Sequence, residues 1–394
     1  MRERASLAEL FFVFLRLGLT SFGGPVAHLG YFRAEFVERR QWLDEHTYAD
    51  LVGLCQFLPG PASSQVGMAI GLSRGGIPGA IAAFLGFTLP SAILLVLFAL
   101  GMARFGNAIG AGWLHGLKIV AVAVVAQALW GMGRALAPDA RRATLAVAAA
   151  ALVSLVPTGA GQVGVIAAGA LIGWGVLRAD LTLPQSSLPV PIRRSTGALL
   201  LAAFFLLLIG LPLAAQGSGN YVLELVDGFY RAGALVFGGG HVVLPLLQAI
   251  VVPGGWVSND AFLAGYGAAQ AVPGPLFTFA AYLGAVSTRA PAGWAGAAIA
   301  LAAIFLPAFL LVAGVLPFWE GLRRHPGIKR AMLGINAAVV GILLAAFYHP
   351  VWTGAILGAA DFSLAATAFL LLVFWKWPPW LVVVLAAAAT GIGP

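Results

Sequence analysis

Apolar residues occur along this chain in runs that are far longer than a β-strand. A run over 197–215 is almost uninterrupted, and other helix-length runs cover 143–156, 162–177, 362–376 and 378–392. At about 1.5 Å of rise per residue, about 20 apolar residues span a bilayer as a helix. Only helices and closed barrels satisfy all their backbone groups in lipid, and runs of this length favour helices. The pattern therefore predicts an all-α polytopic membrane protein.

Two short motifs occur twice along the chain in the same order. The sequence FGG stands at 22–24 and again at 237–239, and PGP stands at 59–61 and again at 273–275. Other positions match between the same two stretches, and the helix-length runs that follow them match as well. Such an order over so long a stretch indicates an internal duplication.

The duplication divides the chain into three parts. The first repeat covers 7–178 and the second covers 221–394, while 179–220 holds a polar, proline-containing linker and one extra transmembrane helix. A single extra crossing between two units with an even number of crossings turns the second unit upside down. We therefore expect two inverted-topology repeats, an arrangement found in many secondary transporters.

The distribution of Lys and Arg supports this inversion. Three arginines lie within 134–142 of the first repeat, whereas the equivalent stretch 348–353 has no Lys or Arg. Conversely, four basic residues lie within 323–330, where the first repeat carries only Arg104. Cytoplasmic loops are enriched in Lys and Arg, so the two repeats are predicted to face opposite ways.

Two apolar segments in each repeat are interrupted by glycine and proline. The breaks lie at 23–25 and 59–61, and again at 237–241 and 272–275. These residues weaken a helix and free its backbone groups, and matched breaks in two repeats indicate a binding site near the membrane midplane. The broken segments either cross fully or form re-entrant hairpins. The arginines within 33–50 favour re-entrant segments, because that arrangement keeps this loop inside.

The chemistry at the breaks suits an anion. A helix that starts after a break has free N–H groups and the positive end of its dipole. The hydroxyl and amide groups that follow the breaks, Ser63, Ser64, Gln65 and Thr278, can donate hydrogen bonds to an anion. Arg16, Arg231 and Lys118 add positive charge. A charge within a membrane segment usually faces a cavity or a partner. The candidate substrate-binding residues are Arg16, Gly23, Gly24, Gln56, Pro59, Gly60, Pro61, Ser63, Ser64, Lys118, Arg231, Gly238, Gly239, Gln270, Pro273, Gly274, Pro275 and Thr278.

Four further residues are candidates for proton coupling. His28 and His241 follow the glycine breaks, and imidazole titrates near neutral pH. Glu9 and Glu224 occupy equivalent positions near the entry of the first segment of each repeat. The competing interpretation makes the histidines packing residues and the glutamates solvated segment ends or counter-ions of nearby arginines.

Composition restricts the function further. Of the 394 residues, 61% are apolar and only 9% are charged, which excludes an ordinary soluble enzyme, a disordered chain or a nucleic-acid binder. The net charge of +8 fits cytoplasmic loops and also an anion path. Cys55 is the one cysteine, so a disulfide or a thiolate metal site is not expected. We expect no catalytic residue, metal or cofactor, and we read no cleaved signal peptide.

The paired motifs FGGP with QFLPGP and FGGGH with QAVPGP resemble the chromate ion transporter (CHR) family in its long, two-domain form. The resemblance covers the chain apart from the linker and the extra helix, and it implies efflux of chromate, an oxyanion shaped like sulfate. It implies chromate resistance and a place in the cell (inner) membrane. The residues that carry the motifs are Arg16, Gly23, Gly24, Pro25, Gln56, Pro59, Gly60, Pro61, Arg231, Gly238, Gly239, Gly240, His241, Gln270, Pro273, Gly274 and Pro275.

We therefore expect a multi-pass secondary transporter that exports chromate. Its expected partners are the chromate or sulfate-like oxyanion and the lipid bilayer, and a homodimer is one of the oligomeric states left open. The sequence lacks a P-loop motif, so an ion gradient or the membrane potential is the expected energy source. An importer of sulfate or a related anion and an anion channel stay open as alternatives. A membrane enzyme is disfavoured, because the sequence shows no clustered His/Asp/Glu or Ser/His/Asp set within its apolar segments. A metal-cation transporter is disfavoured, because the interior charges that match between the repeats are basic.

Overall fold

The computed structural model describes residues 5–109, 111–178, 192–322 and 325–391, and every regular element within these ranges is helical. The first repeat contains α1 (Leu7–Thr20), α2 (Gly24–Arg33), η1 (Ala34–Arg39), α3 (Glu45–Phe57), α4 (Ala62–Ile109), α5 (Ala111–Leu136), α6 (Ala140–Leu155) and α7 (Gly159–Val176). The connecting helix is α8 (Arg194–Ser218).

The second repeat contains α9 (Tyr221–Ala234), η2 (Gly240–Val242), α10 (Val243–Val251), α11 (Asn259–Ala269), η3 (Leu276–Thr278), α12 (Phe279–Val286), α13 (Gly293–Val315), η4 (Leu316–Phe318), α14 (Trp319–Leu322), α15 (Pro326–Ala346), η5 (Phe347–Trp352), α16 (Thr353–Ala355), α17 (Ala359–Val373) and α18 (Pro379–Gly391). Six helices in the described ranges are long and apolar enough to span a membrane. The helix predicted over 197–215 is confirmed as α8, and the four shorter apolar runs are confirmed as α6, α7, α17 and α18.

The first broken segment folds back on itself as an antiparallel hairpin. The rings of Phe14 in α1 and Phe32 in α2 are 5.7 Å apart. Further from the break, Arg40 Nη1 donates to Glu9 Oε1 at 2.7 Å. The two ends of the segment therefore lie together, and the break at Gly23 forms the tip of hairpin α1–α2.

The second broken segment is a hairpin of the same kind. The Arg74 guanidinium in α4 lies 5.1 Å from the ring centre of Trp42, which precedes α3. Helix α4 then reverses at Gly76, where φ is +66° and ψ is −157°. A methyl group on Gly71 would lie 2.4 Å from the carbonyl oxygen of Gly79, whereas residues eight apart in one helix are about 12 Å apart. The long span is thus two antiparallel helices, and the break at 59–61 forms the tip of hairpin α3–α4.

The second repeat builds the same two hairpins. The Thr288 N–H donates to the Trp256 carbonyl oxygen at 2.9 Å, and Arg289 Nη1 pairs with Glu224 Oε2. These contacts bring together the start of α9, the α10–α11 connection and the end of α12. Hairpins α9–α10 and α11–α12 therefore share one outer end, and their breaks form two more tips.

The outer ends of the two hairpin pairs lie at opposite ends of the molecule. After its turn at Gly76, α4 passes the fourth tip, where a methyl group on Gly274 would lie 2.9 Å from Ser91 Oγ. It continues to Phe98, whose ring is 5.8 Å from that of Tyr282 in α12. Since α12 runs from its tip to the outer end of the second pair, α4 leads from one outer end toward the other.

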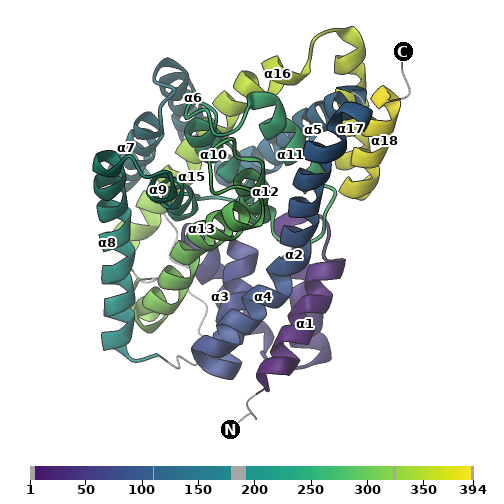
Figure 1. Ribbon diagram of the computed structural model, residues 1–394. Helices are drawn as coiled ribbons and strands as arrows, with labels where there is room; N and C mark the ends of the chain where they lie inside the picture. Colours follow the sequence, from purple (N-terminus) through teal and green to yellow (C-terminus); the bar gives the residue numbers. More distant parts are fainter. Residues whose placement is uncertain (1–4, 110, 179–191, 323–324, 392–394) are drawn as a thin grey trace.

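The two repeats are interlocked through their long helices. Helix α5 packs against α17 and α18 of the second repeat, and α15 packs against α6 and α7 of the first (Figure 1). The equivalent residues Gly116 and Gly334 allow the close approach, because a methyl group there would lie 2.5 Å and 2.0 Å from carbonyl oxygens of α18 and α7. Each repeat is therefore held together by helices of the other.

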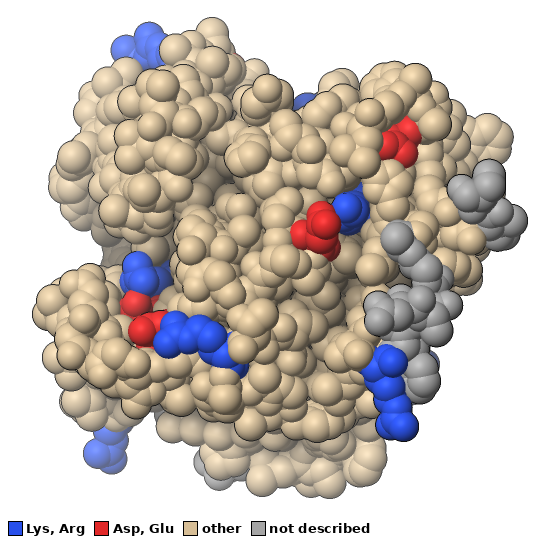
Figure 2. Space-filling view, turned by 45° about the horizontal axis from the view of Figure 1, so that its top comes forward, with Lys and Arg blue, Asp and Glu red and all other residues tan. Residues whose placement is uncertain are grey.

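Basic residues gather at the end of the molecule that holds the N-terminal hairpins. This end, called the basic end below, carries Arg33, Arg39, Arg40 and Arg74, and Arg193 and Arg194 stand at the start of α8 on the same side. The N-terminus and the start of α8 lie at the bottom of Figure 1, on this side. Elsewhere, charged side chains are scattered over an otherwise neutral surface (Figure 2), as expected for a protein surrounded by lipid.

Candidate functional site

The tips of the four hairpins meet in pairs between the two outer ends. The Gly60 N–H donates to the Val236 carbonyl oxygen at 2.7 Å, and the Gly274 N–H donates to the Ser21 carbonyl oxygen at 2.9 Å. Gly60 is equivalent to Gly274, and Ser21 is equivalent to Val236. The two bonds are therefore the same contact made twice, each time between one repeat and the other.

Glycine is required at the donor positions of both bonds. The φ angle is +123° at Gly60 and +95° at Gly274, a region that L side chains rarely adopt. The flanking prolines Pro59, Pro61, Pro273 and Pro275 supply no N–H group to the tips. The sequence motif PGP is thus explained by its structure: a single donating N–H between two residues that cannot donate.

Buried donors begin directly after the second tip. Ser63, Ser64 and Gln65 occupy the first turn of α4, and all three side chains are buried. Gln65 Nε2 donates to the Pro59 carbonyl oxygen at 2.7 Å. Ser64 Oγ and Gln65 Oε1 have no hydrogen-bond partner among the described residues.

His28 joins hairpin α1–α2 to this turn. Its Nδ1 lies 3.2 Å from Ser63 Oγ, and its ring packs edge-on against Phe87 with the centroids 5.3 Å apart. His28 Nε2 is buried without a hydrogen-bond partner in the described ranges, and so are Ser21 Oγ and Thr88 Oγ1. Buried polar atoms without partners are uncommon and call for an explanation such as a bound water, ion or ligand.

These residues form a set that we call the polar cluster: Ser21, His28, Ser63, Ser64, Gln65 and Thr88. Its equivalents in the second repeat are mostly apolar. Phe277 replaces Ser63, Phe279 replaces Gln65 and Phe305 replaces Thr88, with the rings of Phe277 and Phe305 5.7 Å apart. Thr278 keeps the hydroxyl of Ser64 but donates it to the Pro275 carbonyl oxygen at 2.8 Å. The described site is therefore asymmetric.

Sequence reasoning named four members of the polar cluster as candidates, His28, Ser63, Ser64 and Gln65, and missed Ser21 and Thr88. A comparison of the repeats carries a signal that finds these two, since Ser21 stands opposite Val236 and Thr88 stands opposite Phe305.

The two equivalent arginines have different surroundings. Arg16 lies on the exposed face of α1, opposite the face that packs on α4, and no ion pair involves it within the described residues. Arg231 donates from Nε and Nη2 to the two carboxylate oxygens of Asp227, at 2.8 Å and 2.6 Å. Phe12 stands where the second repeat has Asp227, so the first repeat lacks this counter-ion.

Three other candidate charges are paired away from the tips. Lys118 Nζ lies 3.0 Å from Asp260 Oδ1 at the start of α11. Glu9 pairs with Arg40, and Glu224 pairs with Arg289. The two glutamates lie at the outer ends of their hairpins, which agrees with the interpretation of them as segment-end counter-ions.

The remaining candidates surround the tips more loosely. His241 Nδ1 lies 2.8 Å from the Tyr266 hydroxyl. Gln270 is half-buried, Gln56 is exposed on α3, and Gly23 and Gly24 are partly accessible. Gly238 and Gly239 lie near α5, because methyl groups there would contact Leu136 and Met132.

The two ends of the molecule differ in how the hairpins pack on the long helices. A methyl group on Gly267 of α11 would lie 2.2 Å from the Leu117 carbonyl oxygen of α5. At the equivalent Gly53 of α3 nothing lies within 4 Å, and the same face of α3 is exposed at Ala49 and Gln56. Helix α11 thus packs closely against α5, whereas the equivalent face of α3 is exposed and packs against no long helix in the described ranges.

Within the described residues, no group of three or more His, Cys, Asp or Glu side chains is placed to hold a metal ion. Cys55 is buried and unoxidised. The chemistry that the site offers is therefore hydrogen bonding and charge at the meeting point of four helix breaks.

Comparisons with known proteins agree with this architecture. The sequence profile described as Chromate transporter matches residues 8–174 and 223–392, once in each repeat. The chain is 28% identical over 358 residues to the chromate transport protein of Pseudomonas aeruginosa, covering 86% of this chain and 79% of that protein. It is 28% identical over 361 residues to the probable chromate transport protein of Synechococcus elongatus, covering 86% and 84%.

A third relative, the chromate transport protein of Cupriavidus metallidurans, is 27% identical over 351 residues, with 86% of this chain and 82% of the relative covered. No solved structure matches the chain. The profile covers most of the sequence and both of its halves, so this multi-pass membrane protein is a transporter rather than an enzyme, and it belongs to the chromate transporter family.

Proposed function

We propose that this protein is a secondary active transporter that exports chromate, and that the polar cluster at the hairpin tips binds the oxyanion. The observation that carries the proposal is the set of five buried polar atoms without partners in the described ranges: Ser21 Oγ, His28 Nε2, Ser64 Oγ, Gln65 Oε1 and Thr88 Oγ1. The names of the three relatives support chromate as the substrate.

The cluster has the chemistry that a tetrahedral dianion needs. Hydroxyl groups and an imidazole N–H donate hydrogen bonds, and the start of α4 adds free backbone N–H groups and the positive end of its dipole. Hydrogen bonds to a charged group are stronger than neutral ones. Protonation of His28 would add a positive charge beside the anion, which makes His28 the residue that links chromate binding to a proton. His241 lies at the tip of the third hairpin and is the second candidate for this role.

The hairpins are proposed to enter and leave the membrane on one side, as re-entrant segments. In this arrangement the outer ends of α1–α2 and α3–α4 face the cytoplasm, and those of α9–α10 and α11–α12 face outward. The positive-inside rule supports it, because Arg33, Arg39, Arg40 and Arg74 lie at the outer ends of the first two hairpins. The two repeats then have inverted topology, with the divisions 7–178, 179–220 and 221–394. The inside-negative membrane potential drives anions outward.

Transport is proposed to exchange the packing of the two ends. In the present state the outward end is closed by α11 on α5 and by the Lys118–Asp260 pair, while α3 is open toward the cytoplasm. Rocking of the repeats would pack α3 against α15 and separate α11 from α5, so that the polar cluster becomes accessible from the outward side instead of the cytoplasmic side. One closed end supports a carrier over an anion channel.

Removal of single hydroxyls from the cluster tests the proposal. Ser64→Ala should weaken chromate binding by at least about tenfold, since a hydrogen bond to a charged group contributes about 1.5–3 kcal/mol. Saturable chromate counterflow in liposomes measures it, with sulfate as competitor. Ser363→Ala on α17 is the matched control, because that hydroxyl bonds only to the Ala359 carbonyl oxygen at 2.9 Å.

Unchanged half-saturation in Ser64→Ala and in Thr88→Val would remove the cluster from the binding site. Sulfate uptake without chromate uptake would favour the alternative, an importer of sulfate or a related anion. Flux that never saturates would favour a channel.

A further inference from the structure

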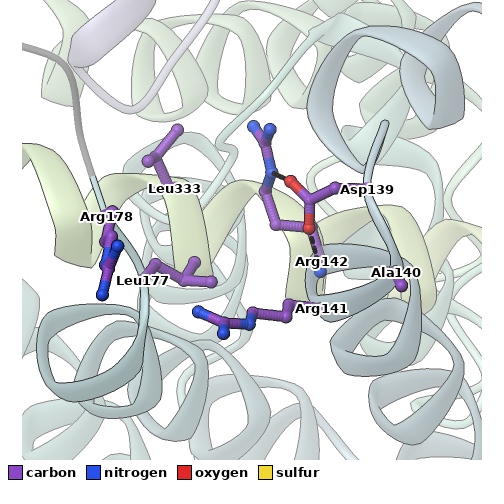
Figure 3. Close-up of a pocket in the computed structure, with 7 residues that line it drawn as sticks. All are labelled: Asp139, Ala140, Arg141, Arg142, Leu177, Arg178 and Leu333. Carbon is purple, nitrogen blue, oxygen red and sulfur yellow. Dashed lines mark hydrogen bonds and ion pairs between the residues drawn. The ribbon is translucent and has the colours of Figure 1, made fainter.

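A second basic site lies where α6 begins and α7 ends. A cavity of about 390 Å³ is lined by Asp139, Ala140, Arg141, Arg142, Leu177, Arg178 and Leu333 (Figure 3). It lies between helices of the first repeat and α15 of the second. Nothing in the proposed transport cycle uses it.

The charges in this cavity are unequally matched. Arg142 Nε pairs with Asp139 Oδ2 at 2.6 Å. The hydrogen bonds from Arg142 hold the pKa of the Asp139 carboxyl below its usual range, so Asp139 is ionised at neutral pH. Arg141 and Arg178 have no ion pair within the described residues, and both are exposed. Figure 3 shows Arg141 extending from α6 toward the end of α7, where Arg178 lies beside Leu177.

The equivalent place in the second repeat is filled by a paired contact. His115 of the first repeat is equivalent to Leu333 of the second, and Asp361 of the second repeat is equivalent to Arg142 of the first. His115 Nε2 lies 2.9 Å from Asp361 Oδ1, and Asp361 Oδ2 accepts the Leu357 N–H at 2.9 Å. The contact that satisfies these side chains in one half of the molecule is therefore replaced in the other half by an open cavity with excess positive charge.

The surroundings of the cavity are those of the membrane interface. Leu177 and Leu333 give it apolar walls. On the adjacent turn of α7, Trp174 and Val176 are each 56% exposed. Tryptophan side chains are enriched at the boundary between lipid and water, and a cationic rim beside an apolar helix face suits a phosphate group that carries acyl chains.

We propose that this cavity binds the headgroup of an anionic phospholipid of the cytoplasmic leaflet, with Arg141 and Arg178 as the phosphate ligands. Basic pockets between transmembrane helices on the cytoplasmic side have this function in other membrane proteins. The phosphate would lie between the two guanidinium groups, and the acyl chains would follow the exposed face of α7. A lipid bound there would join α6 and α7 of the first repeat to α15 of the second.

Native mass spectrometry of the detergent-solubilised protein tests the proposal, with phosphatidylglycerol or cardiolipin titrated against phosphatidylcholine. We expect the wild type to retain the anionic lipids selectively. Arg141→Gln with Arg178→Gln should weaken this retention by about fivefold for each arginine. Arg134→Gln is the matched control, because that exposed arginine lies over the Trp130 ring near the start of α6 in sequence and outside the cavity.

Thermal unfolding in the presence of each lipid gives a second measure that does not depend on transport. The anionic lipid should raise the midpoint for the wild type and for Arg134→Gln but not for the double variant. Equal retention by the double variant and the wild type would overturn the proposal. Equal protection by millimolar inorganic phosphate without lipid would assign the cavity to a free anion and overturn the lipid assignment.

Discussion

At the scale of single residues, the repeats keep their backbone chemistry and lose the equivalence of their side chains. Gly60 and Gly274 make the same N–H bond to the opposite repeat, at 2.7 Å and 2.9 Å. The side chains beside these bonds are polar around Ser64 in the first repeat and aromatic around Phe279 in the second. The two repeats thus share a symmetric frame of helix breaks, and the side chains around that frame are polar in only one of them.

The equivalent arginines test how far this asymmetry extends. Arg16→Gln and Arg231→Gln are each expected to abolish chromate flux while membrane insertion stays intact, because a dianion in a low-dielectric site needs compensating charge. Vesicle flux and immunoblotting of the membrane fraction measure the two effects. Arg39→Gln is the control, since that arginine forms an exposed i,i+4 pair with Glu35. Normal flux in both variants would show that neither guanidinium belongs to the transport site.

At the scale of elements, the positions of the helix breaks could be predicted from the sequence, whereas the directions of the segments rested on a weaker signal, the arginines within 33–50 that favour re-entrant segments. Clustered glycine and proline residues mark the four breaks, whereas the single prolines Pro90, Pro212 and Pro307 lie inside continuous helices. The apolar residues on either side of a break look the same whether the second helix continues across the membrane or turns back to the same side. The reversal at Gly76 lies within one long apolar span, and the packing of α5 on α18 joins positions far apart in the sequence.

The polar cluster was only partly predictable for a related reason. Ser63 and Ser64 follow a helix break, where hydroxyls are expected to satisfy freed backbone groups. Ser21 and Thr88 are single polar residues in apolar segments, and only the fold brings them toward His28. Their burial without partners among the described residues is a property of packing, which no local pattern contains.

A substitution at Gly53 tests the exchange of packing between the two ends. Gly53→Leu fits the present state, because nothing lies within 4 Å of that position. In the exchanged state the side chain would meet the Ile335 carbonyl oxygen of α15, the equivalent of Leu117. We expect chromate binding to persist and counterflow to fall to the background. Gly175→Leu on the exposed face of α7 is the control, and full transport by Gly53→Leu would refute the rocking of α3 onto α15.

At the scale of the whole molecule, the two repeats are structurally interdependent, because each packs its long helix against the last two helices of the other. Helix α5 is held by α17 and α18, and α15 is held by α6 and α7. Each repeat therefore moves only with part of the other. In the transport cycle that we propose, both ends open in alternation around one central site.

Chromate flux in everted membrane vesicles that contain this protein tests the central claim most directly. The flux is measured with sulfate as competitor and with the proton gradient and the membrane potential collapsed separately. We predict saturable, protein-dependent accumulation of chromate that disappears when its driving gradient is collapsed. Vesicles that accumulate no chromate, with sulfate or another anion moving instead, would contradict chromate export, and the absence of any anion flux would contradict the transport site itself.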